Sequence, residues 1–144
     1  LSYANKLNLS IIANQINDSG FYYKTMALRN AYDVFLLSKK TNAKEALNTL
    51  DKLANPLNCF LAGCYEVFNM VDSLEYNKTK KAAAYLRDFY SQFSNREKTK
   101  RQHNRIRIFL RVKLRLIFLY KCTFRKEYRS YFYKRVIDEI WHKR

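Results

Sequence analysis

The chain has 144 residues and a formal net charge of +16, and 48% of its residues are hydrophobic, which suffices for one domain with a buried core and argues against wholesale disorder. With only two glycines and one proline, it lacks the turn residues that a many-stranded sheet requires, so the composition favours a mainly helical fold. Its three cysteines include no CxxC pair, which indicates neither a disulfide framework nor a zinc site, and we expect buried, reduced thiols.

The first two predicted elements are amphipathic helices. Apolar residues recur at helical spacing in LNLSIIANQIND, and Ser19-Gly20 is expected to end that helix. A second helix is predicted over residues 21–38, where Tyr23, Ala27, Ala31 and Phe35 share one side.

Two further helices are predicted before the middle of the chain. Thr41 or Asn42 is expected to cap the third, which Asn55-Pro56 ends, because proline disfavours a helical conformation in the residue before it. The fourth has the most regular apolar period and is predicted to be the central core helix. Its inward residues are Leu57, Phe60, Leu61, Cys64, Val67, Phe68 and Val71.

The second half begins with a polar connection, DSLEYNKTKK, which we expect to be a linker or one short basic β-hairpin near residues 74–84. Apolar residues from Ala82 to Phe93 then predict a helix, and SNREKTKRQHN predicts a polar break. A basic helix is expected from about Arg105 and a last helix from about Phe124. The sum is a single compact domain over residues 1–144 with five to six helices.

The positive charge is confined to the second half. Residues 1–75 contain seven Lys or Arg and seven Asp or Glu, whereas residues 76–144 contain 21 Lys or Arg and five acids. This asymmetry predicts a neutral, core-forming half and a strongly basic half that contacts a polyanion.

The segment RQHNRIRIFLRVKLRLIFLYK, residues 101–121, combines seven Lys or Arg with eleven large apolar residues and no acid. Short stretches alternate like a strand, but FL at 109–110 shifts the phase, so we favour a helix. Arg107, Arg111 and Arg115 then form one row. The charges interrupt any run long enough to span a bilayer, and apolar residues occupy too much of the circumference for a helix lying on a membrane. We therefore expect the helix to be buried on most sides, with the Arg row facing phosphates.

Aromatic residues alternate with basic ones near the end of the chain. Phe124 and Phe132 are expected in the core, whereas Tyr120, Tyr128, Tyr131 and Tyr133 are open to either the core or stacking on unpaired bases.

Recognisable catalytic motifs are few. The sequence has no Gly-rich phosphate loop, no metal-ligand cluster and no nucleophile–base set. Arg96 and His103, in REKTKRQH, have six residues between them, which resembles the R-x4–6-H motif of HEPN-type ribonucleases. That resemblance implies an alternative function, in which the pair assists attack of a ribose 2′-hydroxyl without a metal.

Three segments resemble the seventh protein of the small ribosomal subunit. Asn30 precedes SKKTNA, where Lys39, Lys40 and Ala43 have the family's KKxxA spacing; ALNTL at 46–50 is similar to the helix that follows, and NMVDSLEY at 69–76 to its N-x-x-P-x-V-E-V segment, with Asp72 in place of Pro. The hairpin glycines of the family fall on Ala82 and Ala83. The resemblance implies a highly diverged member that binds the RNA of the small-subunit head, expected in a mitochondrial ribosome or, alternatively, in the cytoplasm.

We therefore predict a structural RNA-binding protein, with a DNA-packaging or peripheral membrane protein as a third possibility. The expected partners are ribosomal RNA and neighbouring ribosomal proteins, with no cofactor, metal, small-molecule substrate, catalysis or membrane span. The predicted RNA-binding residues are Lys39, Lys40, Lys78, Lys80, Lys81, Arg96, Lys98, Lys100, Arg101, Arg105, Arg107, Arg111, Lys113, Arg115, Lys121, Arg125 and Lys126.

Overall fold

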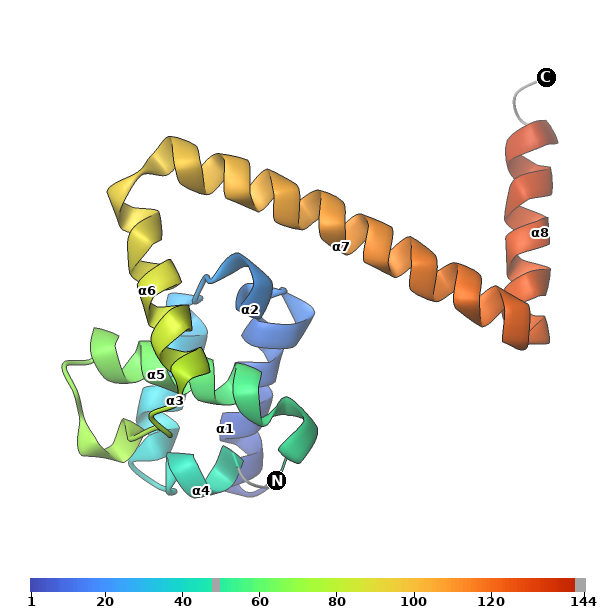
Figure 1. The fold of residues 1–144 in the computed structure, drawn as a ribbon. Coiled ribbons are helices and arrows are strands. Elements are labelled where there is room, and N and C mark those ends of the chain that lie inside the picture. Colours follow the sequence, from blue (N-terminus) through green and yellow to red (C-terminus); the bar gives the residue numbers. More distant parts are fainter. Residues whose placement is uncertain (48–49, 142–144) are drawn as a thin grey trace. The chain divides into compact units, whose positions relative to one another are not determined.

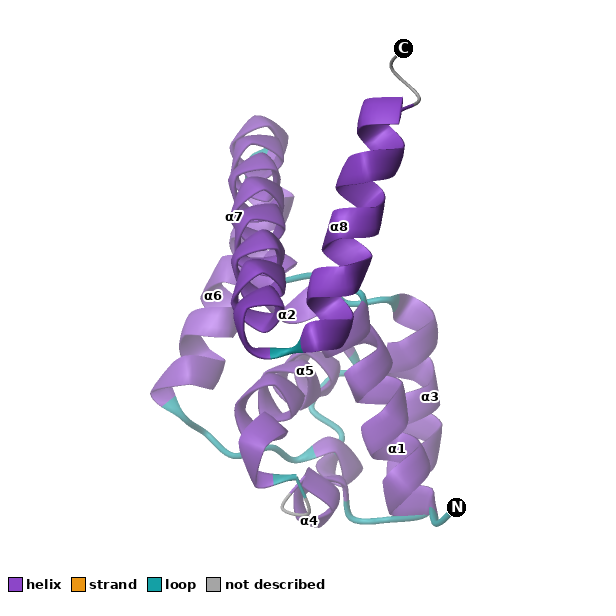
Figure 2. Cartoon of the chain, turned by 90° about the vertical axis from the view of Figure 1, so that its right-hand side faces the viewer, coloured by secondary structure: helices purple, strands orange, loops and turns teal. Residues whose placement is uncertain are grey.

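The prediction of a mainly helical fold is confirmed by the computed structural model, which describes residues 1–47 and 50–141, with side chains through residue 134. The described residues contain helices and loops and no strand (Figures 1 and 2). The α-helices are α1 (Tyr3–Ile12), α2 (Gly20–Tyr23), α3 (Leu28–Ser38), α4 (Ala43–Leu47), α5 (Ala54–Val67), α6 (Lys80–Ser94), α7 (Arg96–Phe124) and α8 (Lys126–Trp141). A π-helical turn (Ala13–Asn17) and two 3-10 turns (Asp51–Leu53 and Asp72–Leu74) complete the elements.

The chain divides into two compact units, whereas the sequence predicted one domain. Unit 1 comprises residues 1–100 and unit 2 residues 101–144. Every buried side chain among the described residues belongs to unit 1, and α7 has none. The described apolar residues of unit 2 are therefore not part of a buried core, whereas those of α6 are buried within unit 1.

The core of unit 1 is built around α5, as predicted. Leu57, Phe60, Leu61 and Cys64 are completely buried there, at 0% exposure. Phe68, which was expected beside them, follows the last residue of α5 and is only partly buried, with its ring stacked on Phe35 at 4.8 Å between centroids. The spacing therefore identified the buried side of this helix correctly but extended it one turn too far.

The first predicted helix is present, but the second is interrupted. Ser2 caps α1 by accepting a hydrogen bond from the Asn5 amide, and the helix continues into the π-helical turn before Ser19. The predicted helix over 21–38 is two helices, because Lys24 adopts a left-handed conformation with φ of 56° and ends α2. A left-handed conformation is uncommon for lysine, so the sequence gives no sign that a helix ends at Lys24.

The third predicted helix is shorter than expected, and its proposed end is the start of the next. Asn42 caps α4, since its Oδ1 accepts a hydrogen bond from the Glu45 amide at 3.1 Å. Residues 48–49 of the ALNTL segment lie outside the described residues. Asn55-Pro56, predicted to end a helix, lies in the first turn of α5. Proline is tolerated there because the first amides of a helix have no partner within it.

The proposed β-hairpin near residues 74–84 is wrong. Residues 75–79 form a loop and α6 begins at Lys80. Thr79 caps this helix by accepting a hydrogen bond from the Ala82 amide at 3.1 Å. The three successive alanines that follow favour a helix over a hairpin, where the turn would require glycine.

The predicted polar break at residues 94–104 is also wrong. Only Asn95 separates α6 from α7, and its Oδ1 accepts a hydrogen bond from the Lys98 amide at 2.9 Å. Residues 96–104, which the apolar pattern placed between two helices, form the capped first turns of α7. Their polarity does not indicate a break, because a solvent-exposed helical turn needs no apolar residue.

Unit 2 contains the rest of α7 and α8, packed through an aromatic cluster. The Phe118 ring lies 6.2 Å from the Tyr128 ring, 6.4 Å from that of Tyr131 and 6.2 Å from that of Phe132. Residues 125 and 126 were predicted to be close to a helix start, and Arg125 is the single non-helical residue between α7 and α8. Phe118 thus holds the two helices together.

Candidate nucleic-acid interface

The predicted RNA-binding residues are all exposed, and the structure places them in four groups. Lys39 and Lys40 follow α3, the lysines at 78–81 begin α6, and the residues from Arg96 to Lys121 lie along α7. Arg125 and Lys126 lie at the start of α8.

Lys39 and Lys40 are held by aromatic rings. The ammonium of Lys39 lies 4.2 Å from the centroid of the Phe35 ring, and that of Lys40 lies 5.2 Å from the Tyr3 ring. Such contacts position a cation without neutralising its charge.

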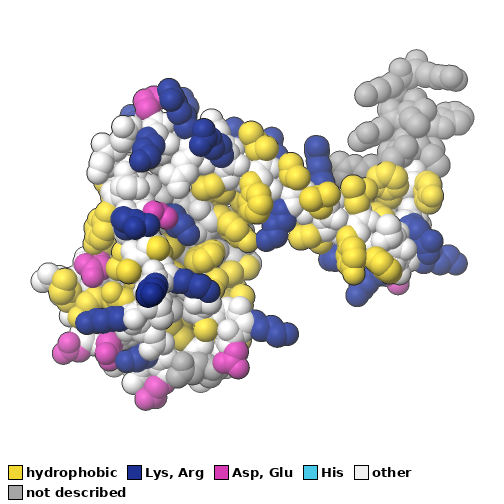
Figure 3. Space-filling view, in the orientation of Figure 1, with side chains coloured by type: hydrophobic (Ala, Val, Ile, Leu, Met, Phe, Trp, Pro, Cys, Tyr) yellow, Lys and Arg dark blue, Asp and Glu magenta, His cyan; other side chains and the backbone are white. Residues whose placement is uncertain are grey.

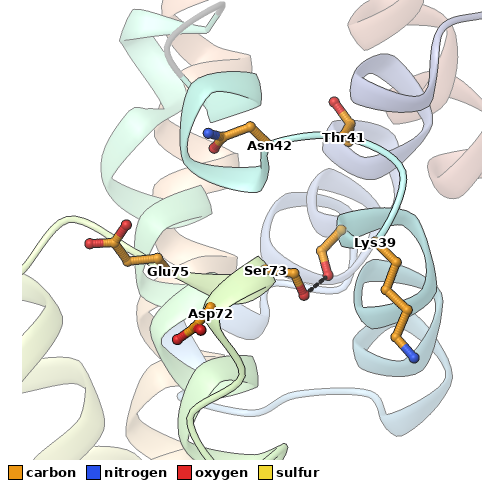
Figure 4. A pocket seen from close by; sticks show the side chains of 7 residues that line it. Lys39, Thr41, Asn42, Asp72, Ser73 and Glu75 are labelled. Carbon is orange, nitrogen blue, oxygen red and sulfur yellow. Dashed lines mark hydrogen bonds between the residues drawn. The ribbon is translucent and has the colours of Figure 1, made fainter.

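The surroundings of Lys39 are electrostatically mixed. A polar pocket of about 250 Å³ is lined by Lys39 together with Asp72 and Glu75 (Figure 4). The pocket lies between the segments SKKTNA and DSLE. Two contacts connect these segments: a hydrogen bond of 2.9 Å between the Ser38 and Ser73 hydroxyls, and an ion pair of 3.3 Å between Lys44 and Glu75. Acids that line the same pocket offset the positive potential, so this group is the weakest candidate for phosphate binding.

The start of α6 is a stronger candidate. Asn58, which is buried in α5, anchors the preceding loop through two hydrogen bonds of 2.8 Å: its Nδ2 donates to the Asn77 carbonyl, and its Oδ1 accepts from the Asn77 amide. The loop and the first turn of α6 therefore present Lys78, Lys80 and Lys81 to solvent.

These lysines oppose the helix dipole. The first turn of α6 contains no acid and instead carries Lys80 and Lys81. The amino end of a helix bears partial positive charge, so cations there are unfavourable and acids are the usual occupants. A bound phosphate would relieve this repulsion and accept hydrogen bonds from the first amides.

The longest group of cations lies on α7. This helix contains ten Lys or Arg and the single acid Glu97, so most of its positive charge has no acidic neighbour on the same helix. Arg107, Arg111 and Arg115 are four residues apart and therefore lie on one side, with a rise of about 6 Å between neighbours. The Arg107 guanidinium donates a hydrogen bond to Asn104 Oδ1 at 2.9 Å, which orients it. We call these three residues the Arg row.

The apolar residues of α7 were expected to be buried, and this prediction is wrong. Phe109 is 55% exposed, Leu114 66% and Leu116 61%. Apolar and basic side chains lie next to one another along this helix (Figure 3). Their large number suggested burial, but all three stay mostly exposed, including Leu114, which lines a groove with Tyr131 and Phe132 of α8.

The start of α8 adds further cations, two of which the sequence analysis left out. Arg129 and Lys134 are exposed in the same way as Arg125 and Lys126. The helical spacing of Arg125 and Arg129, four residues apart, was a usable signal for the first of these. The Lys121 ammonium lies 5.3 Å from the Tyr128 ring, which fixes one cation of α7 beside α8.

The tyrosines that were left open divide in the structure. Tyr128 is half-buried against Phe118, while Tyr120 is 67% exposed and Tyr131 58%. Phe124 and Phe132, expected in the core, are also exposed, at 71% and 38%. Exposed aromatic rings beside cations are available for base stacking.

Three side chains that could act as nucleophiles or proton donors, Cys59, Cys64 and Tyr85, are buried in unit 1. Burial raises the pKa of the Cys59 and Cys64 thiols and raises that of the Tyr85 hydroxyl to about 12, so all three stay neutral near pH 7. Cys122 is half-buried rather than buried as predicted. Among the described residues, no cluster of three or more His, Cys, Asp or Glu has the arrangement of a metal site.

Arg96 and His103, the pair of the alternative function, both lie on α7. Arg96 is its first residue and is exposed, and His103 follows two turns later and is half-buried.

Neither models of known protein families nor curated proteins nor solved structures gave a match to this chain. Within the residues that the structure describes, no helix has the length and apolar character to cross a membrane.

Proposed function

We propose that this chain is a structural RNA-binding protein that holds the RNA backbone through its second half. The observation that carries this proposal is the exposure of every Lys and Arg between residues 76 and 134, eighteen in number against three acids. Exposed cations that outnumber acids sixfold favour a polyanion by releasing its condensed counterions. The lysines at the start of α6, where the helix dipole favours an anion, support the same partner.

Arginine is suited to this role. The guanidinium groups of the Arg row present planar donors that pair with two phosphate oxygens at once. The aromatic residues of unit 2 add surfaces on which unpaired bases would stack, notably Tyr120 and Tyr131. We therefore propose RNA with single-stranded regions as the ligand.

The ribosome is the setting that we propose for this RNA. The similarity of SKKTNA and NMVDSLEY to the seventh protein of the small ribosomal subunit supports it, and the partners would be ribosomal RNA and neighbouring ribosomal proteins. A mitochondrial ribosome agrees best with the extent of the divergence, and a cytoplasmic ribosome is the alternative.

Sedimentation of a native lysate tests the ribosomal setting. We expect the protein to migrate with the small ribosomal subunit on a sucrose gradient and to move to the top after ribonuclease treatment. Migration with other RNA would retain RNA binding but reject the ribosome, whereas free protein before ribonuclease treatment would contradict both.

A further prediction separates this scaffold from a ribonuclease. His103→Ala should leave RNA affinity within about twofold, because the neighbouring cations of α7, and not an imidazole, supply the attraction. Purified protein should produce no RNA fragments ending in 2′,3′-cyclic phosphate when incubated with labelled RNA and EDTA. Fragments made by the wild type and absent with His103→Ala would reject the scaffold in favour of the HEPN-like alternative. Arg96→Ala should then have the same effect.

A further inference from the structure

One side of α7 in unit 2 carries large apolar residues that stay exposed. Phe109, Val112, Leu116 and Tyr120 are separated by three or four residues and therefore lie on one side of the helix. They are 55%, 49%, 61% and 67% exposed. We call these four residues the apolar face. A contiguous exposed patch of this kind marks an interaction site.

The remaining large apolar residues of α7 include a set that α8 already uses. Leu114 and Phe118 are four residues apart, on a side away from the apolar face, and line a groove of about 410 Å³ with Tyr131 and Phe132 of α8. The sequence showed apolar residues around too much of the circumference for a helix on a membrane. Once α8 accounts for Leu114 and Phe118, three other exposed apolar residues of unit 2 on α7, Ile108, Ile117 and Leu119, flank the apolar face, so the exposed apolar surface occupies about half of the circumference, as on a helix that lies on a membrane.

Cations continue the apolar face toward the amino end of unit 2, and the exposed Lys113, four residues after Phe109, lies within it. Arg105 lies four residues before Phe109, and Arg101 four residues before Arg105, so both extend the same side of the helix. Both are exposed. Arg107 and Arg111 of the Arg row lie on the opposite side, since each is two residues from Phe109, whereas Arg115, three residues after Val112, lies at the edge of the apolar face. A ligand of the apolar face must therefore supply apolar surface and negative charge together.

These requirements distinguish between the possible occupants. A second copy of the chain would bring together two helices with ten cations and one acid each, which is repulsive. RNA offers phosphates and flat bases, but bases do not stack on the aliphatic side chains of Val112 and Leu116. An anionic lipid bilayer offers phosphates at its surface and acyl chains beneath them.

We propose that α7 lies on an anionic lipid bilayer, with the apolar face at the boundary of the acyl chains and Arg101 and Arg105 at the lipid phosphates. This activity is separate from the proposed function, because Arg107 and Arg111 point away from the lipid and stay accessible to RNA. The chain would then hold RNA at a membrane surface without spanning it.

Flotation with vesicles tests the proposal on the full chain. We expect the protein to float with vesicles of phosphatidylglycerol and phosphatidylcholine in equal parts, and not with phosphatidylcholine alone. The double variant Val112→Ser with Leu116→Ser should bind the anionic vesicles at least about tenfold more weakly. Each apolar side chain that enters the bilayer contributes binding free energy equivalent to roughly a tenfold change in affinity. Both residues are exposed, so circular dichroism should show an unchanged helix content.

Unit 1 supplies a matched control with the same residue types. Leu28 is 74% exposed and Val67 43% exposed, so Leu28→Ser with Val67→Ser makes the same change on another surface and should float like the wild type. Equal losses in the two double variants, no loss in either, or equal binding to neutral vesicles would each overturn the proposal. So would protein that stays in the bottom fraction, as expected if a second copy or an acidic protein covers the face.

The RNA affinity of the Val112→Ser and Leu116→Ser variant separates this proposal from the function proposed above. That variant retains the Arg row and should bind RNA like the wild type. Flotation of a wild type that binds no RNA would reject the RNA function and support the lipid site, and RNA binding without flotation would do the reverse.

Discussion

Replacing Arg107, Arg111 and Arg115 together by Glu should lower the affinity of the chain for RNA by at least about a hundredfold at physiological salt. Each hydrogen bond to a charged group contributes roughly 1.5–3 kcal/mol, and the three reversed charges would repel the backbone that they now attract. The measurement is the dissociation constant for a labelled single-stranded RNA, taken over a series of salt concentrations. The slope of its logarithm against that of the salt should fall by about two units, since each phosphate contact on a single strand contributes about 0.7.

The control for this experiment changes as many charges in the neutral half. Lys6, Arg29 and Lys52 are exposed residues of unit 1, and their replacement by Glu gives the same net charge. Lys24 is less suitable, because its ammonium lies 4.4 Å from the Phe21 ring and 5.2 Å from the Tyr85 ring and supports the fold there. We expect a loss of less than about tenfold and a smaller change of slope. Equal losses in the two triple variants would mean that RNA responds to net charge and not to the Arg row.

Phe60→Ala should reduce the free energy of unfolding of unit 1 by about 3–5 kcal/mol, which is the usual cost of removing a buried phenylalanine ring. Phe60 is completely buried in α5 and is the largest such side chain among those described. The result is best measured by urea unfolding, followed by circular dichroism. With a total stability of roughly 5–15 kcal/mol for a domain, a change of this size would leave the unit close to unfolding.

Phe68→Ala, at the residue that follows α5, is the matched comparison. Because Phe68 is only partly buried, part of its ring is already in water, and its loss should cost clearly less than that of Phe60. Its stacking on Phe35 adds about 0.5–1.5 kcal/mol to the burial of its area. A larger effect at Phe68 than at Phe60 would contradict the placement of the core around the middle of α5.

The apolar period along the chain was sufficient to find the central helix and its buried side. Leu57, Phe60 and Leu61 could be assigned because every turn of α5 repeats the same pattern. The cap of α4 could be narrowed to Thr41 or Asn42 because a cap has a defined residue type, and the structure shows that it is Asn42. The breaks were harder. A left-handed Lys24 has no sequence signature, and Pro56 fits the first turn of a helix as well as it fits the end of one.

The surroundings of the predicted binding residues could also be predicted only in part from the sequence. Exposure of the Arg row followed directly from its charge, because an unpaired buried guanidinium is too costly. The side chains of Phe109 and Leu116 could not be placed in this way, because an apolar residue is stable either in a core or beneath a partner that the sequence does not contain. The Lys residues at the start of α6 were identified from charge alone, and only the structure adds that they stand at a helix terminus.

The two buried thiols of unit 1 can be used to measure how often this unit opens. Cys59 and Cys64 have raised pKa values because desolvation disfavours the thiolate, and the thiolate is the form that reacts with alkylating reagents. Both would be labelled only when unit 1 opens, so their labelling rate at fixed reagent reports the opening equilibrium of α5 residue by residue. Cys122, half-buried in unit 2, would be labelled sooner. Mass spectrometry of one labelling series would thus follow the two units separately in the same molecule, with or without RNA.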